Sequence, residues 1–325
     1  MSNASAPLPS SDSAREIVIS RVFNAPRELV WRAWSEPDQV AKWWGPRGFS
    51  TTITKHEFRV GGVWEQTMHG PDGTNYPNKS TFKEIVPLER VVYRHGGGRE
   101  NGPGATFLAT WTFETVEGNK TRLTGRLQFG SAEERDFVVK EFGAIEGGKQ
   151  TLERAAEYLA VMQSKPFVIS RDFAVSRDLM WKVWTEREHF AQWFGPKGMD
   201  VVFEKFDLQP GGMNHYKITT PDGKEMWGKA VYREIVPHEK LVWINSFSDA
   251  DAGLTRHPLS KDPWPLQLLT VVTFAEVAGQ TTVTVTWWPF ESEADERDVF
   301  NRSHESMQMG WGGTFDRLGG YLAPR

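Results

Sequence analysis

The sequence contains one long internal repeat. The segment IVISR at residues 17–21 recurs as FVISR at residues 167–171, and the same offset of 150 residues continues without a gap to EIVP at 84–87 and 234–237. Roughly a third of the aligned positions are identical, which is far above chance for an ungapped run of this length. Because each copy is about as long as a domain, we interpret the repeat as a duplication of a whole fold rather than as a solenoid.

The two copies differ mainly in one place. The second copy carries a longer insertion around residues 249–265, which is rich in Pro, Asp, Leu and Trp. Beyond it the copies realign, with Trp111 matching Val272 and Thr151–Leu159 matching Thr314–Leu322.

These boundaries predict three segments: a disordered tail over residues 1–14, a first domain over 15–163 and a second domain over 164–325. The tail is rich in Ser, Ala and Pro and lacks the apolar stretch of a secretion signal. A chain of 325 residues suits two domains of about 150 residues each.

Within one copy, alternating apolar and polar residues predict seven β-strands. Two short helices are expected over 27–35 and 37–44, the first opened by Pro26, and a long helix is expected over 132–162. Strands joined by short turns form an antiparallel sheet, and the long helix is left to cover one of its faces. The predicted fold class is therefore α+β. The strand runs are 16–23, 51–58, 63–68, 82–86, 91–95, 107–113 and 122–129.

The aromatic content is unusual, with 15 Trp and 20 Phe against 6 Tyr. Such large flat side chains suit either a tryptophan-rich core or a broad cavity wall, and the composition leaves both interpretations open. A strongly curved sheet gripping a long helix cannot fill the space between them completely, so we expect concave space for a ligand.

Charge and composition exclude several classes of function. A net charge near −4 with scattered basic residues gives no electrostatic reason to expect nucleic acid or an anionic membrane. The absence of Cys excludes disulfides and thiolate catalysis. No apolar run approaches the roughly 20 residues of a membrane span, and the eight His have no metal-binding spacing. We expect a soluble, cytoplasmic protein without a metal or cofactor.

An ordered set of motifs, present in both copies, resembles one known family. The motifs include AKWWGP at 41–46, GGVW at 61–64 and EIVP at 84–87, and the second copy has AQWFGP at 191–196 and GW at 310–311. They resemble the bacterial proteins related to the C-terminal domain of the activator of Hsp90 ATPase, within the START-like, Bet v 1-like (SRPBCC) superfamily. The similarity covers nearly the whole chain apart from the tail.

This resemblance implies two helix-grip domains, each a curved antiparallel sheet wrapped around a long C-terminal helix. It also implies an internal cavity for a lipid, polyketide, hormone or other small hydrophobic molecule, and it implies no catalytic motif. The Hsp90 activator has a separate N-terminal domain, whereas only a short tail precedes the first copy. Contact with a chaperone is therefore the weaker expectation.

One face of the last helix in the second copy supplies cavity candidates at helical spacing. His304 and Gln308 are its polar members, and a buried polar group needs a partner. We interpret them either as hydrogen-bonding a ligand or pocket water, or as satisfied by neighbouring protein groups. The face consists of Phe300, His304, Met307, Gln308, Trp311, Phe315, Leu318 and Leu322.

The same helix in the first copy departs from this pattern, because Trp311 aligns with Gly148. Loss of the indole predicts either a larger first cavity or a helix bent at Gly147 and Gly148. We therefore expect that the two copies do not bind the same molecule, and one of them could be purely structural.

Strands supply the remaining cavity candidates. Trp64 and Met68 are apolar and share one face of their strand, so this face is expected to point inward; the alternative is that the polar members sit near a strand end and meet solvent. The tryptophans of the second copy are more typical of a core than of ligand contacts. The candidates are Trp64, Gln66 and Met68 in the first copy, and Asn214, Tyr216, Trp227 and Trp243 in the second.

Two functions from different classes follow. The first is a binding module, which would be a carrier, sensor or sequestering protein for a small hydrophobic molecule. The second is an enzyme of the cyclase, dehydratase or hydrolase kind, in which His215 and His304 would work with Glu305 or Glu204 in proton transfer. No catalytic residue is assigned, and we favour binding over catalysis.

Overall fold

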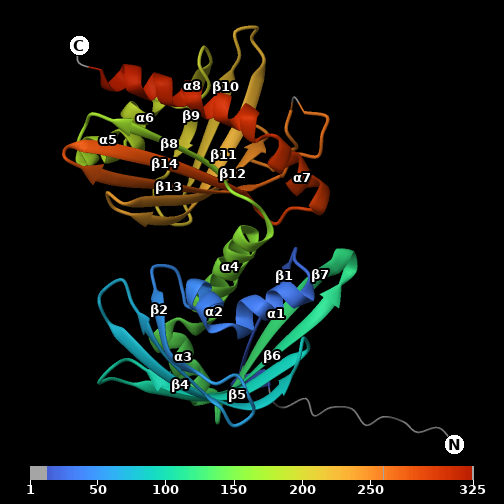
Figure 1. Cartoon of the computed structure of the whole chain (residues 1–325). Helices are drawn as coiled ribbons and strands as arrows, with labels where there is room; N and C mark the ends of the chain where they lie inside the picture. Colours follow the sequence, from blue (N-terminus) through green and yellow to red (C-terminus); the bar gives the residue numbers. More distant parts are fainter. Residues whose placement is uncertain (1–12, 259, 324–325) are drawn as a thin grey trace, which may run out of the picture. The chain divides into compact units, whose positions relative to one another are not determined.

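The chain divides into two compact units, Met1–Leu159 and Ala160–Arg325. The computed structural model describes residues 13–258 and 260–323 (Figure 1). Residues 1–12 of the predicted tail lie outside the described residues, and Ser13–Arg15 form a turn of 3-10 helix, η1. The domain limits given above stay predictions.

The first domain runs through a strand, two helices, six strands and two more helices. Its elements are β1 (Glu16–Phe23), α1 (Arg27–Ser35), α2 (Pro37–Trp43), β2 (Ser50–His56), β3 (Val63–His69), β4 (Asn75–Val86), β5 (Arg90–Gly98), β6 (Gly104–Val116), η2 (Glu117–Asn119), β7 (Lys120–Gln128), α3 (Ala132–Phe142) and α4 (Ala144–Gln163). The strands form one sheet in the order β1-β7-β6-β5-β4-β3-β2.

The second domain repeats this plan. Its elements are β8 (Phe167–Phe173), α5 (Arg177–Thr185), α6 (Arg187–Trp193), β9 (Asp200–Phe206), β10 (Met213–Thr219), β11 (Glu225–Val236), β12 (Lys240–Ser248), β13 (Leu268–Val277), β14 (Gln280–Pro289), α7 (Ala294–Arg302) and α8 (His304–Leu322). The strand order is β8-β14-β13-β12-β11-β10-β9, the same as in the first domain.

Each domain confirms the predicted fold class. Neighbouring strands are antiparallel throughout both sheets, for example β1 with β7 and β8 with β14. In each domain two short helices link the strands at the opposite edges of the sheet, and helices follow its last strand. Figure 1 shows α8, in red, lying across the strands of its own sheet, which is the helix-grip arrangement.

The structure divides the predicted long helix over 132–162 in two. α3 ends at Phe142, Gly143 adopts the left-handed conformation with φ of 59°, and α4 begins at Ala144. Glycine has no Cβ and takes this conformation at little cost, so it commonly ends a helix. The break therefore lies before the glycine pair at which a bend was predicted. In the second domain Ser303 separates α7 from α8, so Phe300 and His304 lie on different helices.

An arginine on the last helix of each domain binds a turn of the chain beside the sheet. Arg154 of α4 donates hydrogen bonds of 2.9 Å to both carbonyl oxygens of Gly45–Pro46. Arg317 of α8 donates to the carbonyl oxygens of Gly195–Pro196 at 3.3 and 2.9 Å. Hydrogen bonds from a charged donor are stronger than neutral ones. The repeated Gly-Pro motif is therefore an acceptor site for the closing helix.

Each domain has a central buried tryptophan on its first short helix, Trp34 on α1 and Trp184 on α5. The two domains fill the space beside this central tryptophan from opposite sides. In the first domain the ring of Trp111, on β6, lies 6.3 Å from that of Trp34. In the second domain the ring of Trp311, on α8, stacks 6.5 Å from that of Trp184. The indole next to the central tryptophan therefore comes from the sheet in one copy and from the helix in the other.

The residue that pairs across the sheet with Trp111, or with Val272 in the second domain, differs in size accordingly. Trp111 pairs across the sheet with Gly125, and a Cβ added at Gly125 would lie 2.7 Å from the Trp111 ring. In the second domain Val272 pairs with Val285. A large side chain therefore faces a glycine in one copy, whereas two medium ones share the space in the other.

We expect the variants Gly125→Val and Trp111→Val each to destabilise the first domain. The first change overlaps the indole, at a cost of about 2 kcal/mol, and the second leaves a cavity, at a cost of about 3 kcal/mol. The double variant reproduces the pair of the second domain, so its cost should fall below the sum by about 1 kcal/mol or more. Urea unfolding of the variants measures these values.

Arg122→Val is the matched control, because Arg122 also lies on β7 and both it and its ion-pair partner Glu114 are exposed. It should leave the free energy of unfolding within about 0.5 kcal/mol of the original. If the losses of stability in Gly125→Val and Trp111→Val simply added up in the double variant, the two side chains would not compete for one space.

Candidate functional site

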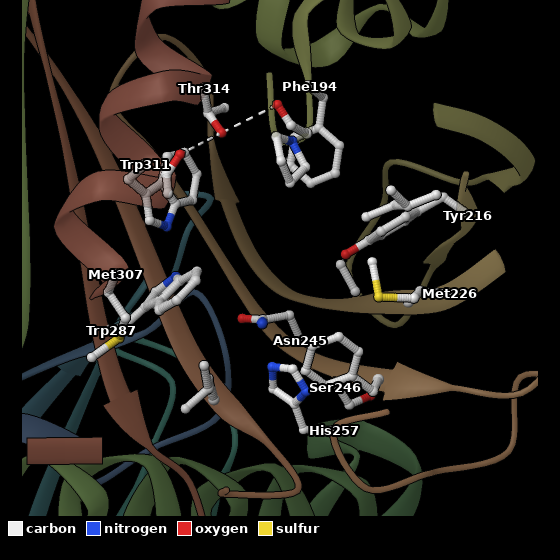
Figure 2. A pocket seen from close by; sticks show the side chains of 18 of the residues that line it. Phe194, Tyr216, Met226, Asn245, Ser246, His257, Trp287, Met307, Trp311 and Thr314 are labelled. Atoms are coloured by element: carbon white, nitrogen blue, oxygen red, sulfur yellow. Dashed lines mark hydrogen bonds between the residues drawn. The ribbon is translucent and has the colours of Figure 1, made fainter. Parts of the chain in front are cut away.

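The second domain contains a cavity of about 540 Å³ between its sheet and α8 (Figure 2). Three neighbouring strands, β10, β11 and β12, face it with every second residue, because successive side chains of a strand point to opposite sides. The α6–β9 turn, α8 and other parts of the domain contribute further lining residues. Among the lining residues are Phe194, Asn214, Tyr216, Ile218, Met226, Ala230, Tyr232, Trp243, Asn245, Phe247, Trp287, Met307, Trp311 and Thr314.

Several polar groups of this cavity are held by protein partners. The Asn214 amide nitrogen donates to the Tyr232 hydroxyl at 2.8 Å. The Asn245 side-chain oxygen accepts a hydrogen bond from the Thr270 hydroxyl. Burial raises the pKa of Tyr216 to about 12, so its hydroxyl stays protonated and can donate to a ligand.

The insertion of the second copy forms one end of this cavity. His257 and Trp264 of the insertion line it, and the His257 ring lies 4.4 Å from that of Phe247. An ion pair between Arg256 and the buried Glu296 of α7 fastens the insertion to the domain. Burial lowers the pKa of His257, which favours the neutral imidazole. In the first domain a short loop joins β5 to β6, so this wall belongs to the second domain alone.

The first domain contains a smaller cavity of about 280 Å³. Trp64 takes the position that Asn214 has in the second copy, and its ring packs 5.0 Å from that of Trp44 and 5.8 Å from that of Trp34. An indole in place of an amide removes space from the cavity. The difference in size between the two cavities follows in part from this one exchange.

Gly148 lines the first cavity and lies close to Ile19 of β1. A methyl carbon of Ile19 lies 2.8 Å from the position that a Cβ would take at Gly148. A side chain larger than that of glycine would therefore collide with β1 at this position. The prediction of a larger first cavity is wrong, because this cavity has about 280 Å³ against about 540 Å³ in the second domain.

Polar side chains from three adjacent strands face the first cavity. They are Gln66 on β3, Asn78 and Ser80 on β4, and His95 on β5. His95 Nδ1 lies 3.2 Å from Ser80 Oγ, and its ring stacks 4.4 Å from that of Phe107. Burial lowers the pKa of His95 to about 4, so the imidazole is neutral at neutral pH.

The structure places most of the predicted site residues beside a cavity, although their contact with a ligand stays a prediction. Trp227 lies at the margin, where its ring stacks on His215 at 4.9 Å. Trp64, Gln66 and Met68 line the first cavity, and Asn214, Tyr216, Trp227, Trp243, Met307 and Trp311 line the second.

Gln308 and His304 do not belong to the described residues that line the cavity. Gln308 follows the inward Met307 and so points about 100° away from it, and its side chain is exposed. His304 lies with its ring 5.8 Å from that of Phe167 and 5.2 Å from that of Phe300. Its Nε2 is buried without a hydrogen-bond partner in the described part of the chain. Burial, aided by the charge of Lys165, lowers its pKa.

The proton-transfer residues predicted for an enzyme do not meet in the cavity. His215 Nε2 lies 3.0 Å from the carbonyl oxygen of Asp249. Neither His215 nor His304 is among the described lining residues, and Glu204 and Glu305 are exposed. Catalysis by this set of side chains therefore lacks a geometric basis.

Sequence reasoning missed His95, Asn245 and His257. His95 and Asn245 are equivalent positions, 150 residues apart, and both line their cavity. The alternation that identified Gln66 and Tyr216 would have identified them if it had been carried on to the next strands. His257 lies in the insertion, where the repeat gives no equivalent position to compare.

Other kinds of site find no support in residues 13–258 and 260–323. Each helix in these ranges is either too short or too polar to cross a bilayer. The same residues contain no group of three His, Asp or Glu side chains placed to hold a metal ion. The two cavities are therefore the candidate functional sites of the described residues.

Two curved antiparallel sheets, each closed by a C-terminal helix over a cavity, define a tandem helix-grip protein. The chain belongs to the Activator of Hsp90 ATPase homolog 1-like family, whose family model matches residues 24–160 and 174–323. Both copies match, so the duplicated unit is the family domain itself. None of the curated proteins matches the chain. Contact with a chaperone stays a prediction.

Solved structures similar to the chain include proteins that match about half of it and one that matches nearly all of it. A protein from Arthrobacter aurescens is 30% identical and covers 47% of this chain and 90% of its own, with a TM-score of 0.43. A protein from Chromobacterium violaceum is 25% identical and covers 45% and 96%, with a TM-score of 0.39. The di-domain ARO/CYC BexL from the BE-7585A biosynthetic pathway is 14% identical and covers 96% and 99%, with a TM-score of 0.44.

We expect acid to destabilise the first domain through His95. Its pKa of about 4 in the folded protein lies below the ordinary value of 6.5. As the pH falls from 6.5 to 4 the unfolded chain therefore binds the proton first, and the free energy of unfolding decreases by up to about 3 kcal/mol.

The variant His95→Asn tests this expectation, because the second domain has Asn245 at the equivalent position. Urea unfolding at pH 7 and pH 4 should show a smaller loss of stability in the variant than in the original protein. Equal losses would show that His95 is not held neutral by its surroundings.

Proposed function

We propose that the second domain binds a small, mainly apolar molecule in its cavity of about 540 Å³. Sites for small molecules usually have a volume of roughly 300–1,000 Å³, apolar walls and a few polar groups. This combination of volume and lining carries the proposal. The aromatic part of the wall consists of Trp184, Phe190, Phe194, Phe203, Tyr216, Tyr232, Trp243, Phe247, Trp264, Trp287 and Trp311.

The polar groups of the wall favour a neutral ligand with a hydrogen-bond acceptor. The protonated hydroxyl of Tyr216 points into the space that Asn245 and Met226 also border (Figure 2). The carboxylate of Asp262, which belongs to the lining, is paired with Arg302 at 3.2 Å. A buried charge on the ligand would lose its hydration without an unpaired protein charge to replace it.

A domain of this kind acts as a carrier, a sensor or a sequestering protein. Broad aromatic walls bind flat or flexible hydrocarbons through the apolar area that is buried, and this interaction depends little on the orientation of the ligand. Catalysis on the same ligand is the weaker alternative, because His215 and His304 do not line the cavity.

We expect the variant Ala230→Phe to weaken binding by at least about tenfold, because a benzyl group on the inner face of β11 fills part of the cavity. Ala275→Phe is the matched control, since Ala275 is exposed on β13 of the same domain. Displacement of a fluorescent fatty-acid analogue by a library of lipids and aromatic compounds measures affinity, and native mass spectrometry of the purified protein detects a retained ligand.

The control should keep the affinity of the original protein. Equal affinities for Ala230→Phe and the original would place the ligand elsewhere. A library without a single binder, together with an empty mass spectrum, would overturn the proposal.

A further inference from the structure

The first cavity has a continuous polar track on one side. Gln66 on β3 pairs across the sheet with Asn78 on β4, and Ser80 on β4 pairs with His95 on β5. All four side chains line the cavity of about 280 Å³. Cross-strand pairs lie side by side on one face of a sheet, so the four polar groups form one connected surface.

Three members of this track already have hydrogen-bond partners. The Asn78 amide nitrogen donates to the carbonyl oxygen of Tyr76 at 2.7 Å. Ser80 Oγ and His95 Nδ1 lie 3.2 Å apart. These bonds fix the side chains within the sheet.

Gln66 is the exception. Its side chain is buried, with 5% exposure, and its Oε1 has no hydrogen-bond partner among the described residues. More than nine in ten buried polar groups in proteins are hydrogen-bonded, and leaving one unsatisfied is costly. A side-chain amide offers both a donor and an acceptor. Gln66 lines the cavity, so a molecule bound there is the nearest source of a group that completes the amide.

The other residues that line the first cavity determine which shape and charge a ligand must have. Trp44, Trp64 and Trp111 give the cavity flat apolar walls. Glu141 is the charged side chain among the described lining residues, and it is paired with Arg99 at 3.2 Å. An anionic ligand would find no free cation in this wall, and a cationic one would find no free carboxylate.

The second domain does not carry the same track. The positions equivalent to Gln66, Asn78 and Ser80 are Tyr216, Gly228 and Ala230, by the constant offset of the repeat. The Tyr216 ring covers Gly228, where an added Cβ would lie 2.7 Å from it. The polar surface is therefore specific to the first domain.

We propose that the first cavity is a second, distinct binding site, selective for a small neutral alcohol or phenol whose hydroxyl group pairs with the amide of Gln66. A hydroxyl both donates and accepts, so it can complete the amide while its hydrocarbon part lies against the indoles. The smaller volume limits this ligand to a smaller size than the ligand of the second domain. The inference rests on the proposed function only in treating the cavities of this chain as ligand sites.

Two matched probes test the selectivity. 4-Propylphenol and propylbenzene differ by the hydroxyl group alone. Binding to the full chain is followed by the shifts of tryptophan indole N–H signals in ¹H–¹⁵N NMR spectra, because Trp64 and Trp111 line the first cavity and Trp243 and Trp311 line the second. We expect the first-cavity signals to report an affinity for the phenol about tenfold above that for the hydrocarbon.

Gln66→Met keeps the length of the side chain and removes its hydrogen-bonding groups. This variant should bind the two probes equally in the first cavity, and its melting temperature without ligand should rise because an unsatisfied polar group is gone. Tyr216→Phe is the control at the equivalent position, and it should leave the first-cavity preference unchanged.

Two failures are distinguishable. If the second-cavity signals respond to apolar probes while the first cavity binds neither probe, or keeps its preference in Gln66→Met, the inference about Gln66 is overturned and the proposed function stands. If the first-cavity preference is found and lost as expected while the second cavity stays silent toward the whole ligand library, the proposed function of the second domain fails alone.

Discussion

Each domain depends on the hydrogen bonds between one arginine of the last helix and the carbonyl oxygens of the Gly-Pro turn. A sheet can curve without a helix, but the cavity exists only where the helix is held at a set distance from the strands. Arg154 and Arg317 tie the helix to the turn beside the sheet, because a guanidinium group presents several donors in a rigid plane. The acceptors are backbone atoms, so the turn contributes its shape rather than its side chains. This explains why the motif recurs in both copies while residues around it differ.

On this common backbone plan, the two copies carry their large side chains at different positions. An indole beside the central tryptophan comes from the sheet in the first domain and from the helix in the second. Trp64 then narrows the first cavity, whereas Asn214 and the insertion widen and extend the second. Interiors are packed almost without voids, so each exchange requires a compensating change at the facing position. The result is two cavities of different size and chemistry on one backbone plan.

The sequence was sufficient for the repeat, the order of elements, the fold class and the inward face of the strand that bears Gln66 and Tyr216. These follow from periodicity and from glycine and proline positions, which are local signals. The helix break at Gly143 was missed because a glycine within an otherwise helical pattern gives no sign of its backbone conformation. Gln308 was wrongly predicted to face the cavity because helical spacing gives the direction of a helix face but not how many residues that face includes. The closeness of Ile19 to Gly148 joins residues far apart in the chain, and a single sequence carries no signal for such a contact.

The break at Gly143 has a consequence for the local stability of one wall of the first cavity. α3 contributes Val138 and Phe142 to the lining, yet Val138 is its one buried residue. A segment with so little buried area opens at a low free energy, well below that of global unfolding. Because the left-handed glycine separates it from α4, α3 can detach while the arginine anchor and the sheet stay in place. We therefore expect the amide hydrogens of α3 to exchange with solvent faster than those of α4.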